Sequence, residues 1–365
     1  MEDNLVYAGF CAVPVGVTLG VYWFFIKHRQ HKSGKPRWWK LVLGNLLVFL
    51  LAGSLAALAG ESYYRFWYDS TDSFAMTKTC LRWFDRHYEV NTFAVRDDRN
   101  YRRTPEAGKR RITFVGDSFT AGHGVADVHD RFANRIRKAH PEWEIHVMAR
   151  LGLDSGDELK LLEELVKGGY KLDQVVLVYN MNDINDVNPD WERRFAIINE
   201  RYKRQRPGFL VEHSYLLNTL YYRMWTFVFP EIFDYYRGTR EAYLGPLWET
   251  HSRRLKAMRD LVQSHGGRLC VATFPFLNLL GPNYAYRDVH KKLDDYWRSI
   301  GVPHLDLLPV YESHTARELM VNSSDAHPNE LAHALAAEAI GPFLEQEMRA
   351  KEGDGTPDSA TAKPQ

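Results

Sequence analysis

The 365-residue sequence is poor in cysteine and carries almost no net charge. Its three cysteines, Cys11, Cys80 and Cys270, have neither the density of a disulfide scaffold nor the spacing of metal ligands. A bridge between Cys80 and Cys270 stays open, although two buried thiols are the favoured interpretation. The 47 basic and 46 acidic side chains leave a formal charge of +1, which gives no general attraction to nucleic acid. We therefore expect no nucleic-acid partner.

Motifs that bind metals or nucleotides are also missing from the sequence. No group of His, Cys, Asp and Glu residues has zinc or calcium spacing. No glycine-rich loop of the Walker or dinucleotide type is present either. We therefore expect neither a metal nor another cofactor.

Charge is absent from two long stretches near the N-terminus, Asn4 to Ile26 and Leu41 to Gly60. Each meets the length of about 20 residues that a helix needs to cross a membrane. Glu2 and Asp3 stand where a cleavable signal peptide would carry basic residues. The sequence therefore predicts a transmembrane hairpin over residues 1–60.

The segment between these stretches, residues 27–40, indicates how the hairpin is oriented. It contains six Lys and Arg side chains and no acidic residue. Short loops rich in Lys and Arg stay in the cytoplasm, by the positive-inside rule. We therefore expect a two-pass protein of the cytoplasmic (inner) membrane, with the bilayer as a partner and everything after Gly60 outside the cytoplasm.

Beyond the hairpin, short apolar runs alternate with helical patterns, which is typical of a parallel sheet with crossover helices. Five strands are predicted, at 112–116, 145–149, 175–179, 269–274 and 304–308. Helices are predicted at 157–167, 247–264, 286–299 and 329–348. This pattern indicates an α/β domain over residues 111–350, with a central parallel five-stranded sheet and helices on both faces.

Three segments lie outside this alternation. Residues 61–110 form a juxtamembrane entry segment that contains Arg96, for which an ion pair is favoured over substrate binding. Residues 188–245 are too long for an ordinary connection and rich in aromatic side chains, so we predict a helical insertion. This insertion has three interpretations: a cover for the functional site, a contact with the bilayer, or a small core of its own.

The tail, residues 351–365, has no bulky apolar residue and is predicted to be disordered.

The sequence Gly116-Asp117-Ser118-Phe119-Thr120 directly follows the first predicted strand. This position puts the Ser118 hydroxyl at the carboxyl edge of the sheet, where open α/β folds bind ligands. A serine near a strand end is by itself more often a helix cap than a nucleophile. Its interpretation therefore depends on the residues at the ends of the later strands.

Three further blocks come after it in order: Ala149-Arg150-Leu151-Gly152, Asn180-Met181-Asn182-Asp183 and Asp325-Ala326-His327-Pro328. Together with the Ser118 block they resemble the SGNH (GDSL-type) hydrolase family, whose four blocks supply serine, glycine, asparagine and histidine. The resemblance covers about residues 111–343 and implies a three-layer α/β/α, flavodoxin-like SGNH fold. The sequence departs from the family's pattern at Asn180, where glycine is usual, and in the two-residue spacing between Asp325 and His327.

The resemblance and the chemistry of ester cleavage imply one role for each block. Ser118 would be the nucleophile, His327 its general base, and Asp325 the group that orients His327. The backbone N–H groups of Ser118 and Gly152 and the side-chain amide of Asn182 would form the oxyanion hole. These five residues make up the predicted catalytic site.

Four neighbours of these blocks have less defined roles. Gly156 rivals Gly152 as the second backbone donor, and the sequence does not decide between them. Asp117, Asp183 and His123 are expected in or behind the pocket, as second-layer or substrate-contacting groups. Asp183 is expected to hold Asn182 by a hydrogen bond.

The sequence therefore predicts a serine ester hydrolase whose substrate is the acyl ester of a glycan, a lipid or a small alcohol. One alternative is an O-acyltransferase or O-acetylesterase that modifies a cell-surface glycan, because a sugar hydroxyl can capture the same acyl-enzyme. Another is a non-catalytic glycan-binding or assembly protein on an SGNH scaffold, which the two departures suggest. No motif names the ester or the oligomeric state.

Overall fold

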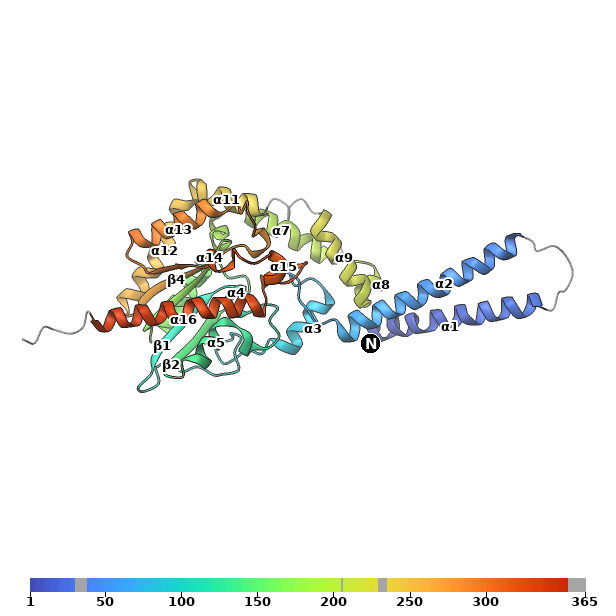
Figure 1. Ribbon diagram of the computed structural model, residues 1–365, viewed down its shortest axis with the longest axis horizontal. Coiled ribbons are helices and arrows are strands. Elements are labelled where there is room, and N and C mark those ends of the chain that lie inside the picture. Colours follow the sequence, from blue (N-terminus) through green and yellow to red (C-terminus); the bar gives the residue numbers. More distant parts are fainter. Residues whose placement is uncertain (30–37, 205, 229–234, 354–365) are drawn as a thin grey trace, which may run out of the picture. The chain divides into compact units, whose positions relative to one another are not determined.

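The computed structural model describes residues 1–29, 38–204, 206–228 and 235–353 (Figure 1). The chain divides into two compact units, residues 1–83 with 198–232, and residues 84–197 with 233–365. Most of the predicted cytoplasmic loop lies outside the described residues, as does the predicted disordered tail from residue 354 onward. All three cysteines are thiols, and Cys80 and Cys270 are buried.

The larger unit is built on a parallel sheet in the order β2-β1-β3-β4-β5. The bounds are β1 (Arg110–Gly116), β2 (Trp143–Ala149), β3 (Gln174–Asn180), β4 (Arg268–Phe274) and β5 (His304–Asp306). At its carboxyl end, Gly116 of β1 pairs with Ala149 of β2 on one side and Val178 of β3 on the other. The predicted five-stranded parallel sheet is confirmed, and its carboxyl ends lie at one edge.

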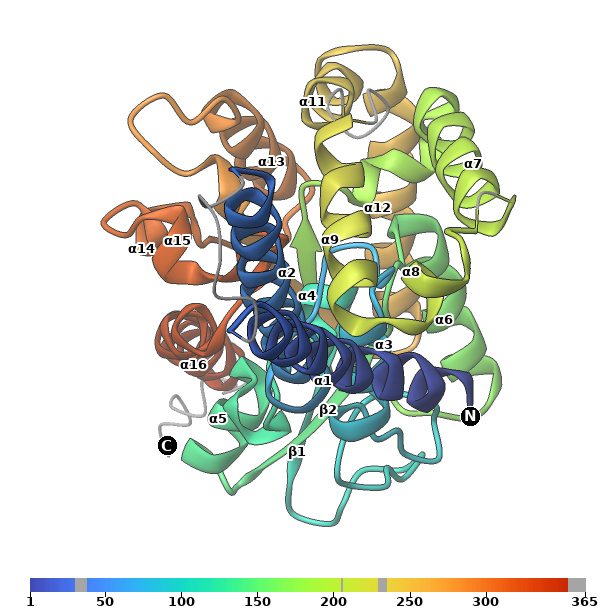
Figure 2. The same ribbon diagram turned by 90° about the vertical axis from the view of Figure 1, so that its right-hand side faces the viewer.

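Helices cover both faces of this sheet, and Figure 2 shows α5 and α16 on one side of β1 and β2, with α6 and α12 on the other. The longer helices are α5 (Phe132–Ala139), α6 (Ser155–Lys167), α11 (Tyr235–Leu244), α12 (Leu247–Ser264), α13 (Arg287–Ser299) and α16 (Glu330–Gly353). Successive strand residues face opposite layers. Phe114 packs with α5 and α16, whereas Val115 packs with α6 and α12. The predicted three-layer architecture is therefore confirmed.

Several short elements complete the larger unit. They are α4 (Ser118–Ala121), η2 (Val128–Asp130), η3 (Asp183–Val187), η4 (Leu277–Leu279), α14 (Leu308–Tyr311) and α15 (Ala316–Leu319). An antiparallel pair, β6 (Met320–Asn322) and β7 (Asp325–Pro328), precedes α16. Neither α5 nor this pair was predicted, and β6 and β7 are too short for a pattern of apolar residues to repeat.

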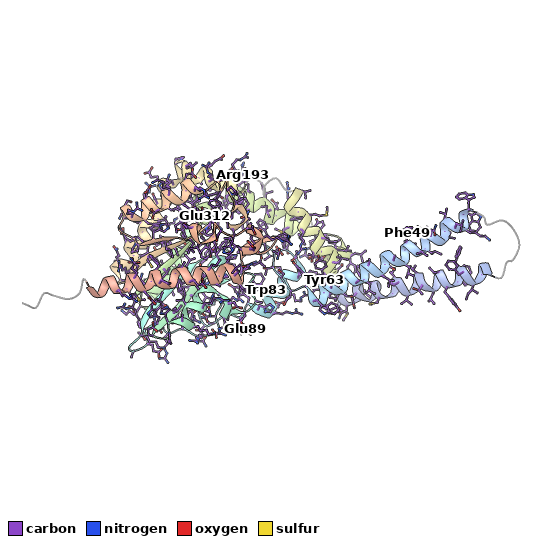
Figure 3. All side chains as sticks on the ribbon, in the orientation of Figure 1. Phe49, Tyr63, Trp83, Glu89, Arg193 and Glu312 are labelled. Atoms are coloured by element: carbon purple, nitrogen blue, oxygen red, sulfur yellow. The ribbon has the colours of Figure 1, made fainter. Side chains whose placement is uncertain are left out.

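The smaller unit contains two long apolar helices, α1 (Glu2–Arg29) and α2 (Trp38–Ser62), followed by a π-helical turn, η1 (Tyr63–Trp67). They run antiparallel, since the Tyr7 hydroxyl lies 3.0 Å from the Ser62 hydroxyl. Both are long and apolar enough to cross a membrane. Apolar side chains project outward from them, as Figure 3 shows for Phe49, which is 76% exposed. These features agree with the predicted hairpin.

The segment predicted as a helical insertion contains α7 (Pro189–Arg204), α8 (Phe209–His213), α9 (Tyr215–Val228) and α11, and α3 (Lys78–His87) lies upstream of the sheet. In the smaller unit the buried Glu61 carboxylate accepts hydrogen bonds from the Ser214 hydroxyl at 2.6 Å and the Leu216 N–H at 2.9 Å. These bonds attach the start of α9 to the end of α2. Met76, Tyr222 and Trp225 form a small core there, which is the third interpretation of the insertion.

Candidate active site

The strand order brings the ends of three predicted strands together. β1 lies between β2 and β3. The chain therefore runs from β1 to the neighbouring strand β2, and then crosses back over to β3 on the other side of β1. Such a reversal point is where open α/β sheets bind ligands. Ser118 follows β1, Gly152 follows β2 and Asn182 follows β3. All three therefore lie at the same edge of the sheet.

Ser118 is the first residue of α4, and the turn that precedes it has no room for larger side chains. A Cβ on Gly116 would lie 2.9 Å from the carbonyl oxygen of Val178 on β3. Asp117 caps α4, since its carboxylate accepts the Phe119 N–H at 2.9 Å. Gly122 ends the helix with a φ of +75°, a left-handed conformation that glycine adopts at little cost.

A chain of hydrogen bonds connects Ser118 to two residues near the C-terminus. The Ser118 Oγ lies 2.8 Å from Nε2 of His327, and Nδ1 of the same ring lies 2.5 Å from Oδ1 of Asp325. Asp325 and His327 belong to β7, where residues two apart point to the same side. The strand therefore explains how a two-residue spacing still joins the carboxylate to the imidazole.

Asp325 is buried, with 1% of its surface exposed. Burial would by itself raise the pKa of this carboxyl, but the charges and hydrogen bonds of His327 and His123 outweigh burial and hold the pKa well below its usual range. The carboxylate is therefore ionised at neutral pH. It can stabilise an imidazolium that forms on His327 when Ser118 gives up its proton.

His123 occupies the other side of this carboxylate. Its Nε2 lies 3.2 Å from Oδ2 of Asp325, and its ring stacks on the His327 ring with centroids 4.1 Å apart. The sequence placed His123 only in or behind the pocket. The contact with Asp325 had no sequence signal, because the two residues come from distant segments.

The two glycines that compete as oxyanion donors differ in their surroundings. The N–H of Gly156 is directed at the carboxylates of Asp154, at 3.1 Å, and Asp186, at 2.9 Å. Gly152 lies in the turn after β2 with a φ of +73°, and a Cβ there would meet nothing within 4 Å. The N–H of Gly156 is therefore occupied at the start of α6, while Gly152 lies in an open turn at the sheet edge.

The side chain of Asn180 contacts the nucleophile's helix cap, which gives the departure from glycine a structural role. Its Nδ2 lies 3.3 Å from the Asp117 carboxylate, and its backbone N–H donates to the Asp183 carboxylate at 2.9 Å. Asp183 was expected to hold Asn182 directly. Its carboxylate instead accepts from Asn180, so it stabilises the turn that carries Asn182.

Arg96 stabilises the loop that follows Ser118. Its guanidinium is buried and donates to the carbonyl oxygens of Gly122, at 2.6 Å, and Val125, at 2.7 Å. The neighbouring Asp97 carboxylate pairs with Arg131 at 3.1 Å and with Arg137 at 2.6 Å. Arg96 thus has a structural role, which it performs by donating hydrogen bonds to backbone carbonyls.

His123, Asp325 and His327 are also the one group among the described residues whose ligand atoms are close enough for a metal ion, within 4.8 Å of one another. Each of the three already has a hydrogen-bonding partner in the group, and His327 also contacts Ser118. A metal here would have to replace these contacts.

No family model matches the chain, and a comparison with curated proteins gives no match. Among solved structures, the extracellular lipase of Streptomyces rimosus is 13% identical, with a TM-score of 0.42, over 65% of this chain and 99% of its own. Phospholipase A1 from Streptomyces albidoflavus is 13% identical, with a TM-score of 0.39, over 66% and 99%. A member of the lipolytic protein G-D-S-L family from Veillonella parvula is 12% identical, with a TM-score of 0.38, over 63% and 95%. These distant similarities carry no functional assignment, which depends on the side chains of this chain.

A fully buried acid whose pKa is affected by the charge of Asp117 was not predicted. Glu158 on α6 has no hydrogen-bond partner for either carboxylate oxygen among the described residues. Burial, and then the charges of Asp117 and Asp154, raise its pKa well above the usual value. A sequence signal was available, because Glu158 shares its helix face with the core residues Leu161, Leu162 and Leu165.

The raised pKa of Glu158 makes stability depend on pH. The folded protein binds the Glu158 proton more tightly than the unfolded chain, so this group's stabilising effect is lost as pH rises above the usual glutamate pKa. We expect Glu158→Gln to lose less thermal stability than wild type between pH 5 and pH 9, as measured by melting temperature. Glu164→Gln, an exposed site on the same helix, is the control. If the melting temperatures of Glu158→Gln and wild type fell equally between pH 5 and pH 9, the raised pKa of Glu158 would be contradicted.

Proposed function

We propose that the chain is a serine ester hydrolase of the SGNH type that acts through an acyl-enzyme on Ser118. The observation that carries the proposal is the row of three groups formed by the Ser118 hydroxyl, the His327 imidazole and the Asp325 carboxylate, with contacts of 2.8 Å and 2.5 Å. A hydroxyl next to a base that a third group orients is the arrangement that nucleophilic acyl transfer requires.

In the acylation step, Oγ of Ser118 bonds to the carbonyl carbon of the ester while its proton passes to Nε2 of His327. The resulting tetrahedral intermediate collapses, the bond to the alcohol oxygen breaks, and that oxygen takes the proton from His327. The alcohol leaves, and the acyl group stays on Ser118. Asp325 stabilises the imidazolium between the two transfers and keeps the Nδ1 proton directed at itself.

In the deacylation step, a water molecule gives a proton to His327 as its oxygen bonds to the acyl carbon. The bond from that carbon to Oγ of Ser118 then breaks, and Ser118 recovers the proton from His327. The carboxylic acid leaves, and the enzyme returns to its starting state. A sugar hydroxyl in place of water would make the product a new ester, so the transferase alternative differs only in the acceptor.

The oxyanion of both tetrahedral intermediates would be bound by the N–H groups of Ser118 and Gly152 and by the Asn182 amide. Gly152 is preferred to Gly156 because the N–H of Gly156 already donates to two carboxylates. Asn182 follows β3, which pairs with β1, the strand that precedes Ser118. Donors fixed before the reaction stabilise developing charge more than mobile water does.

We also propose that the hairpin spans the cytoplasmic membrane and that the enzyme acts outside the cytoplasm. Two observations support this location: the long apolar helices with exposed side chains, and the basic segment of residues 27–40. The substrate is then an acyl ester that is accessible outside the cytoplasm, carried by a glycan, a lipid or a small alcohol.

The central prediction concerns the nucleophile. Purified Ser118→Ala should lose hydrolysis of short p-nitrophenyl esters and labelling by a fluorophosphonate, because the proposed acyl-enzyme forms on its hydroxyl. Ser324→Ala, at a partly exposed serine in the β6–β7 turn, is the matched control and should keep both. Activity of Ser118→Ala equal to wild type would sink the hydrolase proposal, and a folded wild-type protein that takes no label would favour the non-catalytic alternative.

A second prediction concerns the oxyanion hole. Asn182→Ala should lower kcat by about 100-fold to 1000-fold, with a much smaller change in KM, because the donor acts on charge that develops in the transition state. Steady-state kinetics on the same esters measure the effect. A loss of less than about threefold would remove Asn182 from the proposed site.

A third prediction concerns topology. In intact cells, a membrane-impermeant maleimide should label Glu312→Cys, an exposed site in the larger unit, and should not label Ser33→Cys in the basic segment. Permeabilised cells should allow labelling of both. The wild-type protein, with its three natural thiols, sets the background. The reverse labelling pattern would place the enzyme in the cytoplasm.

A further inference from the structure

We propose that His123 is a positioning residue for the proposed hydrolysis: it holds Asp325 from the side opposite His327, and its protonation limits activity at low pH. The inference rests on the proposed function, because it concerns the same reaction. Each carboxylate oxygen of Asp325 contacts a different imidazole, Oδ1 that of His327 and Oδ2 that of His123.

His123 is also tied to the nucleophile's helix. Its backbone N–H donates to the carbonyl oxygen of Ser118 at 3.0 Å. Gly122 and Gly124, on either side of it, have φ values of +75° and +86°. These left-handed residues turn the chain sharply after α4. The turn places His123, which is 3% exposed, against Asp325 on β7. One residue therefore links the segment that carries Ser118 to the strand that carries the base.

The contact with Asp325 requires a proton on Nε2 of His123, because a carboxylate can only accept. With this proton in place the Asp325 carboxylate has a donor for each oxygen and cannot rotate without losing one. A buried carboxylate that loses a partner becomes much less stable. His123 thereby fixes the carboxylate plane, and through it the orientation of the His327 ring toward Ser118.

The stacked rings make the arrangement sensitive to pH. When His327 takes the Ser118 proton, the new imidazolium lies against the face of His123 at a centroid separation of 4.1 Å. A neutral His123 ring does not repel the His327 imidazolium. A protonated His123 ring does repel it, because like charges at this separation interact strongly in a partly buried site. His327 then becomes a poor base.

The charged and titratable groups around His123 support this account. Asp325 and His327 face it from β7. Arg96 binds the Gly122 carbonyl next to it, and the Arg131 side chain approaches Gly122. The Phe84 ring meets the His123 ring edge-on, at 5.3 Å between ring centroids. The Asp325 carboxylate thus contacts both His123 and His327.

Two substitutions separate the contributions of His123. His123→Gln keeps an N–H donor near the position of Nε2 but cannot be protonated, whereas His123→Phe keeps a ring and loses the donor. The exposed His129, changed to Gln, is the matched control. The measurement is kcat and KM for p-nitrophenyl acetate from pH 5 to pH 9, on the full-length protein in detergent. Melting temperatures show that each variant is folded.

We expect His123→Gln to remain active to lower pH than wild type, with the acid limb of kcat shifted by on the order of one pH unit. His123→Phe should lose about 10-fold or more in kcat at pH 8, with KM within about twofold, because Asp325 is no longer held. His129→Gln should match wild type. A structural role alone would lower activity at every pH without moving the acid limb.

The outcomes distinguish this inference from the proposed function. If wild type is active, Ser118→Ala is inactive, and both His123 variants keep the wild-type pH profile and kcat, the inference is wrong and the hydrolase proposal stands. If Ser118→Ala is as active as wild type, the hydrolase proposal itself is wrong. An acid limb that moves in His123→Phe but not in His123→Gln would also overturn the inference, since neither variant can be protonated at this position.

Discussion

Ser118 and His327 are separated by 209 positions in the chain, and the 2.8 Å contact between them is the constraint on which the proposed chemistry depends. Ser118 is held at the end of β1 by a turn in which Gly116 lies against Val178. His327 is held by β7, a strand of four residues outside the main sheet. The short β6–β7 pair therefore keeps the imidazole over the serine.

Three buried acidic residues near the site, Asp97, Glu158 and Asp325, differ in how their burial is compensated. The charge of Asp97 is compensated by Arg131 and Arg137, so removing either partner would leave an uncompensated buried charge next to Arg96. Glu158 has no such partner among the described residues, and its raised pKa means that it stays protonated where an exposed glutamate would ionise. Asp325 differs from both: its charge is compensated by the imidazoles of His123 and His327, which themselves titrate. The Asp97 ion pairs hold the scaffold, while in the proposed mechanism Asp325 links the site to the protonation of His123 and His327.

Much of the larger unit could be predicted because its signals are local. The five strands are apolar runs bounded by turns, and α12 was predicted with its observed ends, Leu247 and Ser264. The pair β6–β7 could not be predicted this way, since three or four residues show no period. The hydrogen bond of Asp183 to Asn180 was also missed. It depends on how one turn closes, whereas the expectation considered only that Asp183 is next to Asn182.

The sequence by itself determined the five strands of the main sheet, the order of the four blocks, and the residue types able to supply a nucleophile, a base and an acid, because all of these are properties of neighbours along the chain. Tertiary structure decided which groups meet. It directed the N–H of Gly156 at two carboxylates, buried Glu158 without a hydrogen-bond partner among the described residues, and placed His123 against Asp325. Contacts between distant segments depend on the packing of the whole sheet edge, and no local pattern records them.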